Sequence, residues 1–218
     1  MTAEVEIVRV AYPVPYYAQV ASPDLASAIF RQGLAPALDP RWTESGAETV
    51  EEYVYWTDRA CGVACVKMCV EALGGPVRPL LVWARAGVKI GGYLTDLRPD
   101  GSPYERGWLH SALAELMRGE SLAAQPRPAA VEEFPALLAS GSLLIASVSY
   151  EIGLPGPVTK RGGHLVVVSG AELQDGRLAT LILHNPSGRT AKMRAYARIP
   201  VERFESGYTG RVIVVGRE

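Results

Sequence analysis

The residue whose position best suits it for chemistry is Cys61, which opens the segment CGVACVKMCVEALGG after a long loop. Apolar residues recur through this segment at three- and four-residue spacing, which predicts a helix over 61–73 that ends at Gly74-Gly75-Pro76. The first turn of a helix has backbone N–H groups without intrahelical partners, and the macrodipole adds roughly half a positive charge there. Both effects favour the nucleophilic thiolate, and the same N–H groups can hold a developing oxyanion.

Cys65 and Cys69 follow one and two turns further along the same predicted helix. Their spacing lacks the C-x2-C pair common in structural zinc sites, and no nearby histidine completes a ligand set. We therefore interpret both as small core residues, and we predict neither a metal site nor another cofactor. The position of Cys61 alone leaves a packing role and a catalytic role equally open, so its assignment depends on a partner base.

His164 is the best placed of the three histidines to act as that base. It follows Arg161-Gly162-Gly163 and opens the apolar run HLVVVSGA, so a glycine loop presents its imidazole at the start of a predicted strand. The next predicted strand ends at His184-Asn185-Pro186, after an Asp175-Gly176 hairpin signal. If the two strands pair, Asn185 reaches His164, and its amide oxygen can fix the tautomer of the imidazole.

The other two histidines have simpler interpretations. His184 competes for the role of base, but its neighbour Asn185 points to the opposite face of the strand, so the two cannot both face one site. His110, in WLHSALAEL, is typical of a residue on a helix surface. The catalytic hypothesis is therefore a Cys–His–Asn set formed by Cys61, His164 and Asn185.

Predicted helices and strands divide unevenly along the chain. A short strand is expected over 5–10, and helices are expected over 24–32, 80–86, 108–117 and 131–139. Runs rich in β-branched residues follow over 142–150, 164–171, 178–184 and 212–215, with Gly, Pro and Asp turns between them. Helices that precede an antiparallel sheet indicate an α+β fold, with an N-terminal helical part packed on a C-terminal antiparallel sheet.

The composition is that of an ordinary folded domain. The 218 residues are 48% hydrophobic and 21% charged, and the net charge of −1 gives no electrostatic footprint for nucleic acid or an anionic membrane. No apolar run approaches the roughly 18 residues of a membrane span, and the N-terminus does not resemble a secretory signal. Three cysteines in one short segment do not make a disulfide framework, so reduced thiols and a cytoplasmic location are expected.

The segments CGVACVKMCVEALGG, GGHLVVVSGAEL and LILHNPSG, in this order, resemble the C39-like branch of the papain-like cysteine peptidases. The tail IPVERFESGYTGRVIVV is similar to the closing segment of that family. The resemblance implies a single papain-like domain over 1–218, with Cys61 as nucleophile because the family's nucleophile precedes a glycine. It also implies that His164 is the base and Asn185 its orienting partner. Gln19, in VPYYAQ, matches the glutamine that helps to form the family's oxyanion hole.

The range 20–58 would then be an insertion between Gln19 and Cys61, because the family's glutamine usually lies close before its cysteine. This insertion is rich in acidic and aromatic residues. It either lines a groove for a cationic or aromatic group or forms a solvated acidic helix, roughly TVEEYVYW, whose aromatics pack inward; we favour the second interpretation. The glycine- and proline-rich loop over 153–163 is a candidate lid.

The sequence thus predicts an enzyme that cleaves a peptide or amide bond through a thioester on Cys61. An acyltransferase or peptide cyclase would need the same residues and would differ in how it excludes water. A non-catalytic binding module is a third possibility, although such a module would not need Cys61, His164 and Asn185 together. The expected partner is a peptide or another acyl or amide substrate.

Overall fold

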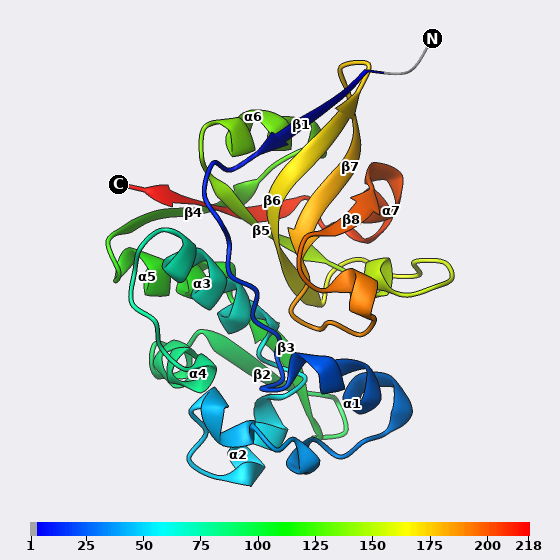
Figure 1. Cartoon of the computed structure of the whole chain (residues 1–218). Coiled ribbons are helices and arrows are strands. Elements are labelled where there is room, and N and C mark those ends of the chain that lie inside the picture. The colour runs from blue at the N-terminus through cyan, green and yellow to red at the C-terminus, as the bar shows by residue number, and fades with distance from the viewer. Residues whose placement is uncertain (1–3) are drawn as a thin grey trace.

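The computed structural model describes residues 4–218 and has an α+β fold, as predicted. Helices occupy mainly the N-terminal half and strands the C-terminal half (Figure 1). The helices are α1 (Ala26–Gln32), α2 (Val50–Trp56), α3 (Cys61–Ala72), α4 (Leu80–Lys89), α5 (His110–Arg118), α6 (Phe134–Ala139) and α7 (Val201–Gly207). The strands are β1 (Val5–Arg9), β2 (Tyr93–Leu97), β3 (Pro103–Trp108), β4 (Leu122–Pro128), β5 (Leu143–Val148), β6 (His164–Gln174), β7 (Arg177–His184), β8 (Ala197–Pro200) and β9 (Arg211–Arg217).

The main sheet is built around β6, the longest strand. Its order within the described chain is β4-β9-β5-β6-β7-β8, and β1 pairs with the outer half of β6. Each of these pairings is antiparallel. The apolar run of β6 is buried from His164 to Glu172, which explains why this strand reads as a continuous hydrophobic segment.

Helix α3 packs against β6, and this contact joins the helical part to the sheet. Nine successive residues of α3, from Gly62 to Val70, are buried. Gly62 is required at its position because a Cβ there would lie 2.8 Å from the indole ring of Trp108. The first turn of α3 is therefore held between β6 and the end of β3.

The hairpin of β2 and β3 was not predicted, and the helix expected to begin at 108 begins at His110 instead. Most side chains of the hairpin are exposed, so its sequence shows no apolar alternation that would indicate a strand. The expected helix over 80–86 is longer and reaches Lys89. Strand β4 was not predicted because it contains Pro126 and Pro128, and proline argues against a strand. Both prolines are tolerated here because β4 lies at the edge of the sheet.

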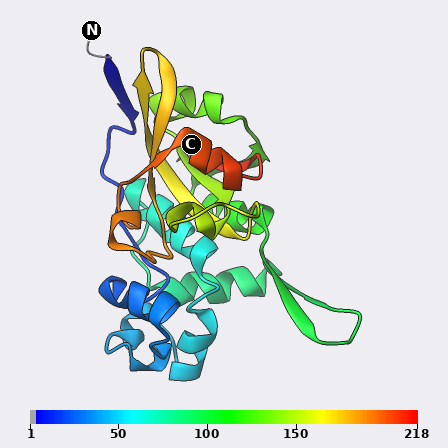
Figure 2. The ribbon, with the colours of Figure 1, turned by 90° about the vertical axis from the view of Figure 1, so that its right-hand side faces the viewer.

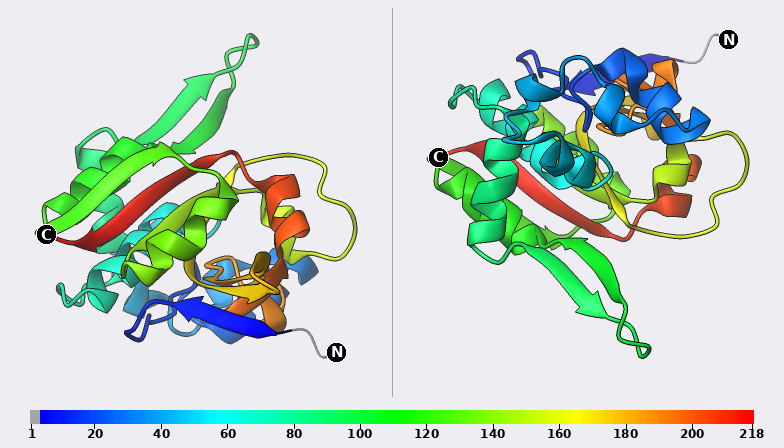
Figure 3. Two further views of the ribbon diagram at one scale, coloured as in Figure 1. Left: turned by 90° about the horizontal axis from the view of Figure 1, so that it is seen from above. Right: turned by 90° about the horizontal axis from the view of Figure 1, so that it is seen from below.

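The range 20–58 forms α1, α2 and short 3-10 turns, and these lie at the end of the molecule away from the sheet (Figure 1). The hairpin of β2 and β3 projects from the side of the molecule (Figures 2 and 3). Over residues 4–218, no helix has the length and apolar character needed to span a bilayer.

Candidate active site

Cys61 and His164 line the same cavity of about 270 Å³. Cys61 is the first residue of α3 and His164 the first residue of β6, so the packing of this helix on this strand brings the two starts together. The backbone N–H of Leu165 interacts with the thiol of Cys61, which places Cys61 against the start of β6, the strand that His164 opens. The other lining residues are Asp58, Arg59, Tyr93, Glu105, Arg106, Gly107, Trp108, His110, Ser147, Gly163 and Leu165.

Asn185 holds the imidazole of His164 through a hydrogen bond of 2.8 Å between its Oδ1 and the Nε2 of the ring. Oδ1 also accepts hydrogen bonds from the backbone N–H of Ser187 at 3.1 Å and from its hydroxyl at 2.9 Å. The backbone N–H can only donate, so it fixes the amide with its oxygen toward the ring. The Nε2 must then carry the proton, and the Nδ1 of a neutral imidazole is left as the acceptor.

Burial decides the protonation of both groups in the resting site. Cys61 is partly exposed to the cavity, yet burial raises the pKa of its thiol to about 11, and the N–H groups of Leu165 and Gly62 oppose this only in part. Burial also lowers the pKa of His164 to about 4, although the hydrogen bond that its Nε2 donates to Asn185 acts in the other direction. The N–H group of Gly62 at the helix start thus favours the thiolate, as expected, and burial opposes it more strongly.

Gln19 lies close to this site in space, although the range 20–58 separates it from Cys61 in sequence. Its side chain is buried and its Nε2 donates to the carbonyl of Thr57 at 2.9 Å. Its backbone N–H donates to the carbonyl of Pro186, next to Asn185, at 2.8 Å. Gln19 does not line the cavity in the free protein, and one amide proton remains beyond the one given to Thr57. Its oxyanion role stays a prediction.

Of the other two histidines, His184 lies away from the cavity and His110 lines it. His184 is fully buried between the rings of Tyr16 and Tyr196, away from the cavity, and neither of its ring nitrogens has a hydrogen-bond partner. His110 is the half-buried first residue of α5 and lines the cavity, a position that the sequence did not indicate. Its position at the cavity was missed because the hairpin of β2 and β3, which ends just before α5, was not predicted. Cys65 and Cys69 are buried core residues, as expected.

A cluster that the sequence analysis missed fixes the outer wall of the cavity. The Nε1 of Trp108 donates to the carbonyl of Arg59 at 2.7 Å, and the Arg59 side chain pairs with Glu105 at 2.5 Å. Tyr93 donates to the same carboxylate at 2.7 Å. Trp56 of the insertion stacks on Trp108 with ring centroids 5.5 Å apart. Because Arg59 lies two positions before Cys61, this cluster positions the segment that leads into the nucleophile.

The range 20–58 mostly follows the interpretation that we favoured, in which acidic side chains face solvent and aromatic side chains pack inward. Tyr53 and Trp56 of α2 are buried, whereas Glu48 and Glu51 face solvent. Asp39 is an exception among the acids, since it is buried and accepts hydrogen bonds from Ser22 and Tyr53. Asp58, at the end of the range, does line the cavity.

The loop over 153–163 is tethered at several points. The carboxylate of Glu151 accepts from the backbone N–H of Thr159 at 2.7 Å and from its hydroxyl at 2.9 Å. Arg203 of α7 donates to the carbonyls of Ile152 and Gly156 at 2.8 and 3.0 Å. Gly163 at the loop's end lines the cavity, so movement of this loop would reach the site. Its action as a lid stays a prediction.

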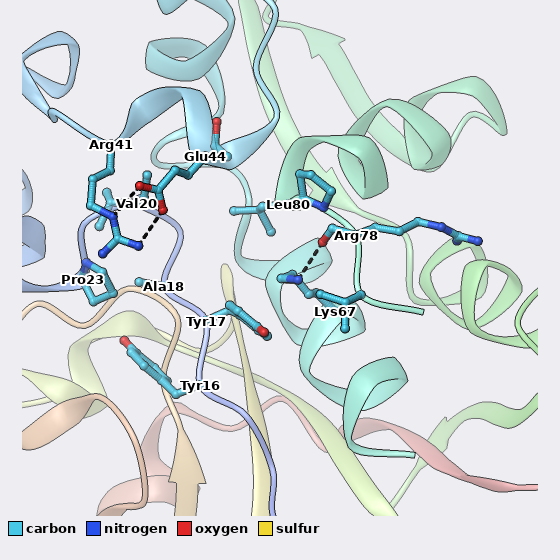
Figure 4. A pocket seen from close by; sticks show the side chains of 14 residues that line it. Tyr16, Tyr17, Ala18, Val20, Pro23, Arg41, Glu44, Lys67, Arg78 and Leu80 are labelled. Carbon is cyan, nitrogen blue, oxygen red and sulfur yellow. Dashed lines mark hydrogen bonds and ion pairs between the residues drawn. The ribbon is translucent and has the colours of Figure 1, made fainter. Parts of the chain in front are cut away.

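A second cavity of about 410 Å³ lies between the insertion and α3 (Figure 4). Its charged side chains are already paired, since Arg41 binds Glu44 and the buried Lys67 binds Glu71 and the carbonyl of Arg78. Neither Cys61 nor His164 lines it. The cavity at the start of α3 is therefore the candidate active site.

The fold is that of the papain-like cysteine peptidases of the C39 type. One solved structure with this fold is the peptidase domain of Streptococcus ComA, a bifunctional ABC transporter involved in a quorum-sensing pathway. It aligns with a TM-score of 0.51 at 16% identity, over 73% of this chain and 93% of that one. A double-glycine-motif protease from an AMS/PCAT transporter, solved with its leader peptide, aligns with a TM-score of 0.45 at 16% identity. No protein-family profile and no curated protein matches the sequence.

Proposed function

We propose that this protein is a C39-like cysteine peptidase that hydrolyses a peptide bond through Cys61, His164 and Asn185. One combined observation carries the proposal. Cys61 at the start of α3 shares a cavity with His164, and the Nε2 of His164 is held by the side-chain oxygen of Asn185. This arrangement leaves the Nδ1 of His164 free to accept a proton, which is what a cysteine nucleophile needs from its base.

Because burial disfavours the charged forms of both groups, we take the reaction to begin from a thiol and a neutral imidazole. As the Sγ of Cys61 attacks the carbonyl carbon, the Nδ1 of His164 takes the thiol proton, and Asn185 stabilises the imidazolium that forms. The backbone N–H groups at the start of α3 face the developing oxyanion, with Gln19 as the expected side-chain donor. The C–N bond breaks as His164 protonates the leaving amine.

Water then completes the reaction. His164 takes a proton from a water molecule as that water attacks the thioester carbon, and the acid product leaves as the proton returns to the Sγ of Cys61. If an amine attacked in place of water, the same steps would transfer the acyl group. Product analysis with and without added amine nucleophiles distinguishes peptidase from acyltransferase or cyclase activity.

The proposal includes the organisation and location of the protein. We place residues 1–218 in one papain-like domain with an insertion at 20–58. Trp56 of this range packs on the cavity wall and belongs to the main core, although Val20, Ala26 and Ile29 form a small cluster of their own with Ala18. We also place the protein in the cytoplasm, since the chemistry needs a reduced Cys61 and all three cysteines are free.

A peptide library tests the proposal directly. Wild-type protein is incubated with the library and cleavage sites are read by mass spectrometry. We expect cleavage that Cys61→Ala and His164→Ala each abolish. Cys65→Ala is the matched control because this cysteine lies one turn further along α3 and is fully buried, so cleavage should persist. Cleavage that survives Cys61→Ala, or that Cys65→Ala removes equally from a folded protein, would overturn the assignment.

Alkylation with iodoacetamide gives a test that needs no substrate. Selective labelling of Cys61 is expected from exposure alone, since Cys65 and Cys69 are buried. The informative measurement is therefore the rate at Cys61 near neutral pH in wild type and in His164→Ala. A slower rate in the variant supports proton acceptance by His164, and an unchanged rate contradicts it.

A further inference from the structure

The hairpin of β2 and β3, residues 93–108, is called the arm below. It stands away from the body of the protein (Figures 2 and 3), and within the described chain its two strands pair with each other alone. An isolated two-stranded hairpin is marginally stable in water unless something packs on it. Most of the arm is exposed, so the rest of the described chain leaves its faces uncovered, whereas its base is attached to Arg59.

The base of the arm is part of the candidate active site. Tyr93, Glu105 and Trp108 line the cavity together with Cys61. The ion pair of Glu105 with Arg59 and the hydrogen bond from Trp108 to the Arg59 carbonyl attach the arm to the segment that carries the nucleophile. A substrate held at Cys61 thus touches the root of the arm.

A β-bulge directs the arm at the cavity. The strand register places Leu94 opposite Gly107 and Thr95 opposite Glu105, so Arg106 is an extra residue on β3. Gly107 has a φ of 87°, which glycine adopts without strain. Both bulge residues line the cavity. Bulges next to active sites re-aim side chains and bend the strand, and this one turns the root of β3 toward Cys61.

One face of the arm continues the cavity wall outward. Side chains alternate along a strand, so Tyr93, Thr95 and Leu97 point to the same face, and the register puts Trp108 and Glu105 opposite the first two. We call this set of five residues the arm face. At its root Trp108 is buried against Trp56, and Glu105 is neutralised by Arg59, so the accessible part of the face is its outer part, without a strong net charge. Leu97, 66% exposed, is its outer apolar end.

We propose that the arm face is a docking surface for the peptide substrate, which crosses it in an extended conformation on one side of the scissile bond. This inference rests on the proposed function, and it states that the arm face recognises the stretch of substrate on that side of the scissile bond. Tyr93 and Leu97 are four positions apart, a distance of about 13 Å, which about four residues of extended peptide also span. An apolar substrate side chain about four residues from the cavity packs on Leu97.

The arm offers a matched pair of variants. Leu97 lies on the arm face, whereas Tyr104, paired with Asp96, lies on the opposite face and is 37% exposed. Leu97→Ser and Tyr104→Ser are compared on a cleaved peptide that extends about six residues to each side of the scissile bond, enough to reach Leu97. A truncated version, with about two residues on each side, serves as the second substrate.

We expect Leu97→Ser to lower kcat/KM for the long peptide about tenfold, mainly through KM, because it removes one apolar contact. It should leave the truncated peptide unaffected. Tyr104→Ser should change neither substrate by more than about twofold. Equal effects of the two variants, or no effect of Leu97→Ser on the long peptide, would overturn the docking proposal while leaving the peptidase proposal intact.

Failure of the peptidase proposal gives a different result. If no peptide is cleaved and alkylation of Cys61 does not depend on His164, binding of fluorescent long peptides from the library is measured on Cys61→Ala. Binding that Leu97→Ser weakens and Tyr104→Ser does not would support the arm face without catalysis. Binding insensitive to Leu97→Ser, or no binding, would overturn it.

Discussion

Replacing Asn185 with alanine is the sharpest perturbation of the candidate site, because it removes one side chain without touching the nucleophile or base. The change deletes the 2.8 Å bond to the Nε2 of His164 and leaves a buried N–H without an acceptor. An unsatisfied buried polar group costs about 1–3 kcal/mol. If the transition state loses the same 1–3 kcal/mol of stabilisation because the imidazole is no longer held in the reactive tautomer, the rate falls by roughly 5- to 150-fold, at one factor of ten per 1.36 kcal/mol.

Asn185→Asp is the informative companion variant. A carboxylate accepts the same hydrogen bond, so it keeps the proton on Nε2, and its charge raises the pKa of His164 above the value of about 4 that burial imposes. We expect Asn185→Asp to retain most of kcat/KM at neutral pH and to move the acid limb of the pH profile upward.

The assay is kcat/KM on a peptide identified from the library, measured from about pH 4 to pH 9, with urea denaturation of each variant as the control for folding. Asn185→Ala should lose activity by more than its loss of stability explains. A folded Asn185→Ala that cleaves at the wild-type rate would refute the role of Asn185 in orienting the base.

Three further outcomes follow from burial. His184, with a pKa lowered to about 4 by burial, stays neutral in the fold while the unfolded chain gains a proton below about pH 6.5. The free energy of unfolding should therefore fall between pH 6.5 and 4, by up to about 3 kcal/mol for this group. Because His164 contributes a fall of the same sign, His184→Phe should reduce the pH dependence of the urea-denaturation midpoint over that range without abolishing it, and an unchanged slope would contradict the assignment. Iodoacetamide labelling of Cys61 should keep rising with pH well above neutrality, since its pKa is about 11, whereas a plateau by pH 7 would show a resting thiolate. Gly62→Ala should destabilise the fold by about 1–3 kcal/mol and reduce cleavage, because its Cβ would displace Trp108; wild-type stability would show that the ring moves freely.

Local patterns were enough for the elements that carry the candidate triad. The apolar spacing after Cys61 predicted α3, and the runs around His164 and Asn185 predicted β6 and β7 with the Asp175-Gly176 turn between them. A two-residue turn makes the two strands antiparallel neighbours, so the approach of Asn185 to His164 follows almost from the chain itself.

Local patterns failed where burial was low or the contacts were distant. Apart from its root at Tyr93 and Trp108, the arm is largely exposed, so its strands carried no apolar periodicity. Without the arm, the places of His110 and Trp108 in the cavity wall could not be predicted. Gln19 looked too far from Cys61 because its separation in sequence does not show that the chain over 20–58 comes back to the same place. Its hydrogen bonds to Thr57 and Pro186 place it near the segments that carry Cys61 and Asn185.

The sequence by itself determined which residues can act: a cysteine at a helix start, a histidine at a strand start and an asparagine at the end of the paired strand. Helix periodicity, strand alternation and a tight turn are local, and they specify those positions without knowledge of the rest. Only the tertiary structure decided that burial raises the pKa of Cys61 and lowers that of His164, because the cost of charging a group depends on everything packed around it. It also decided that a projecting arm begins at the same cavity, since that contact joins residues whose separation in sequence predicts nothing about their distance in space.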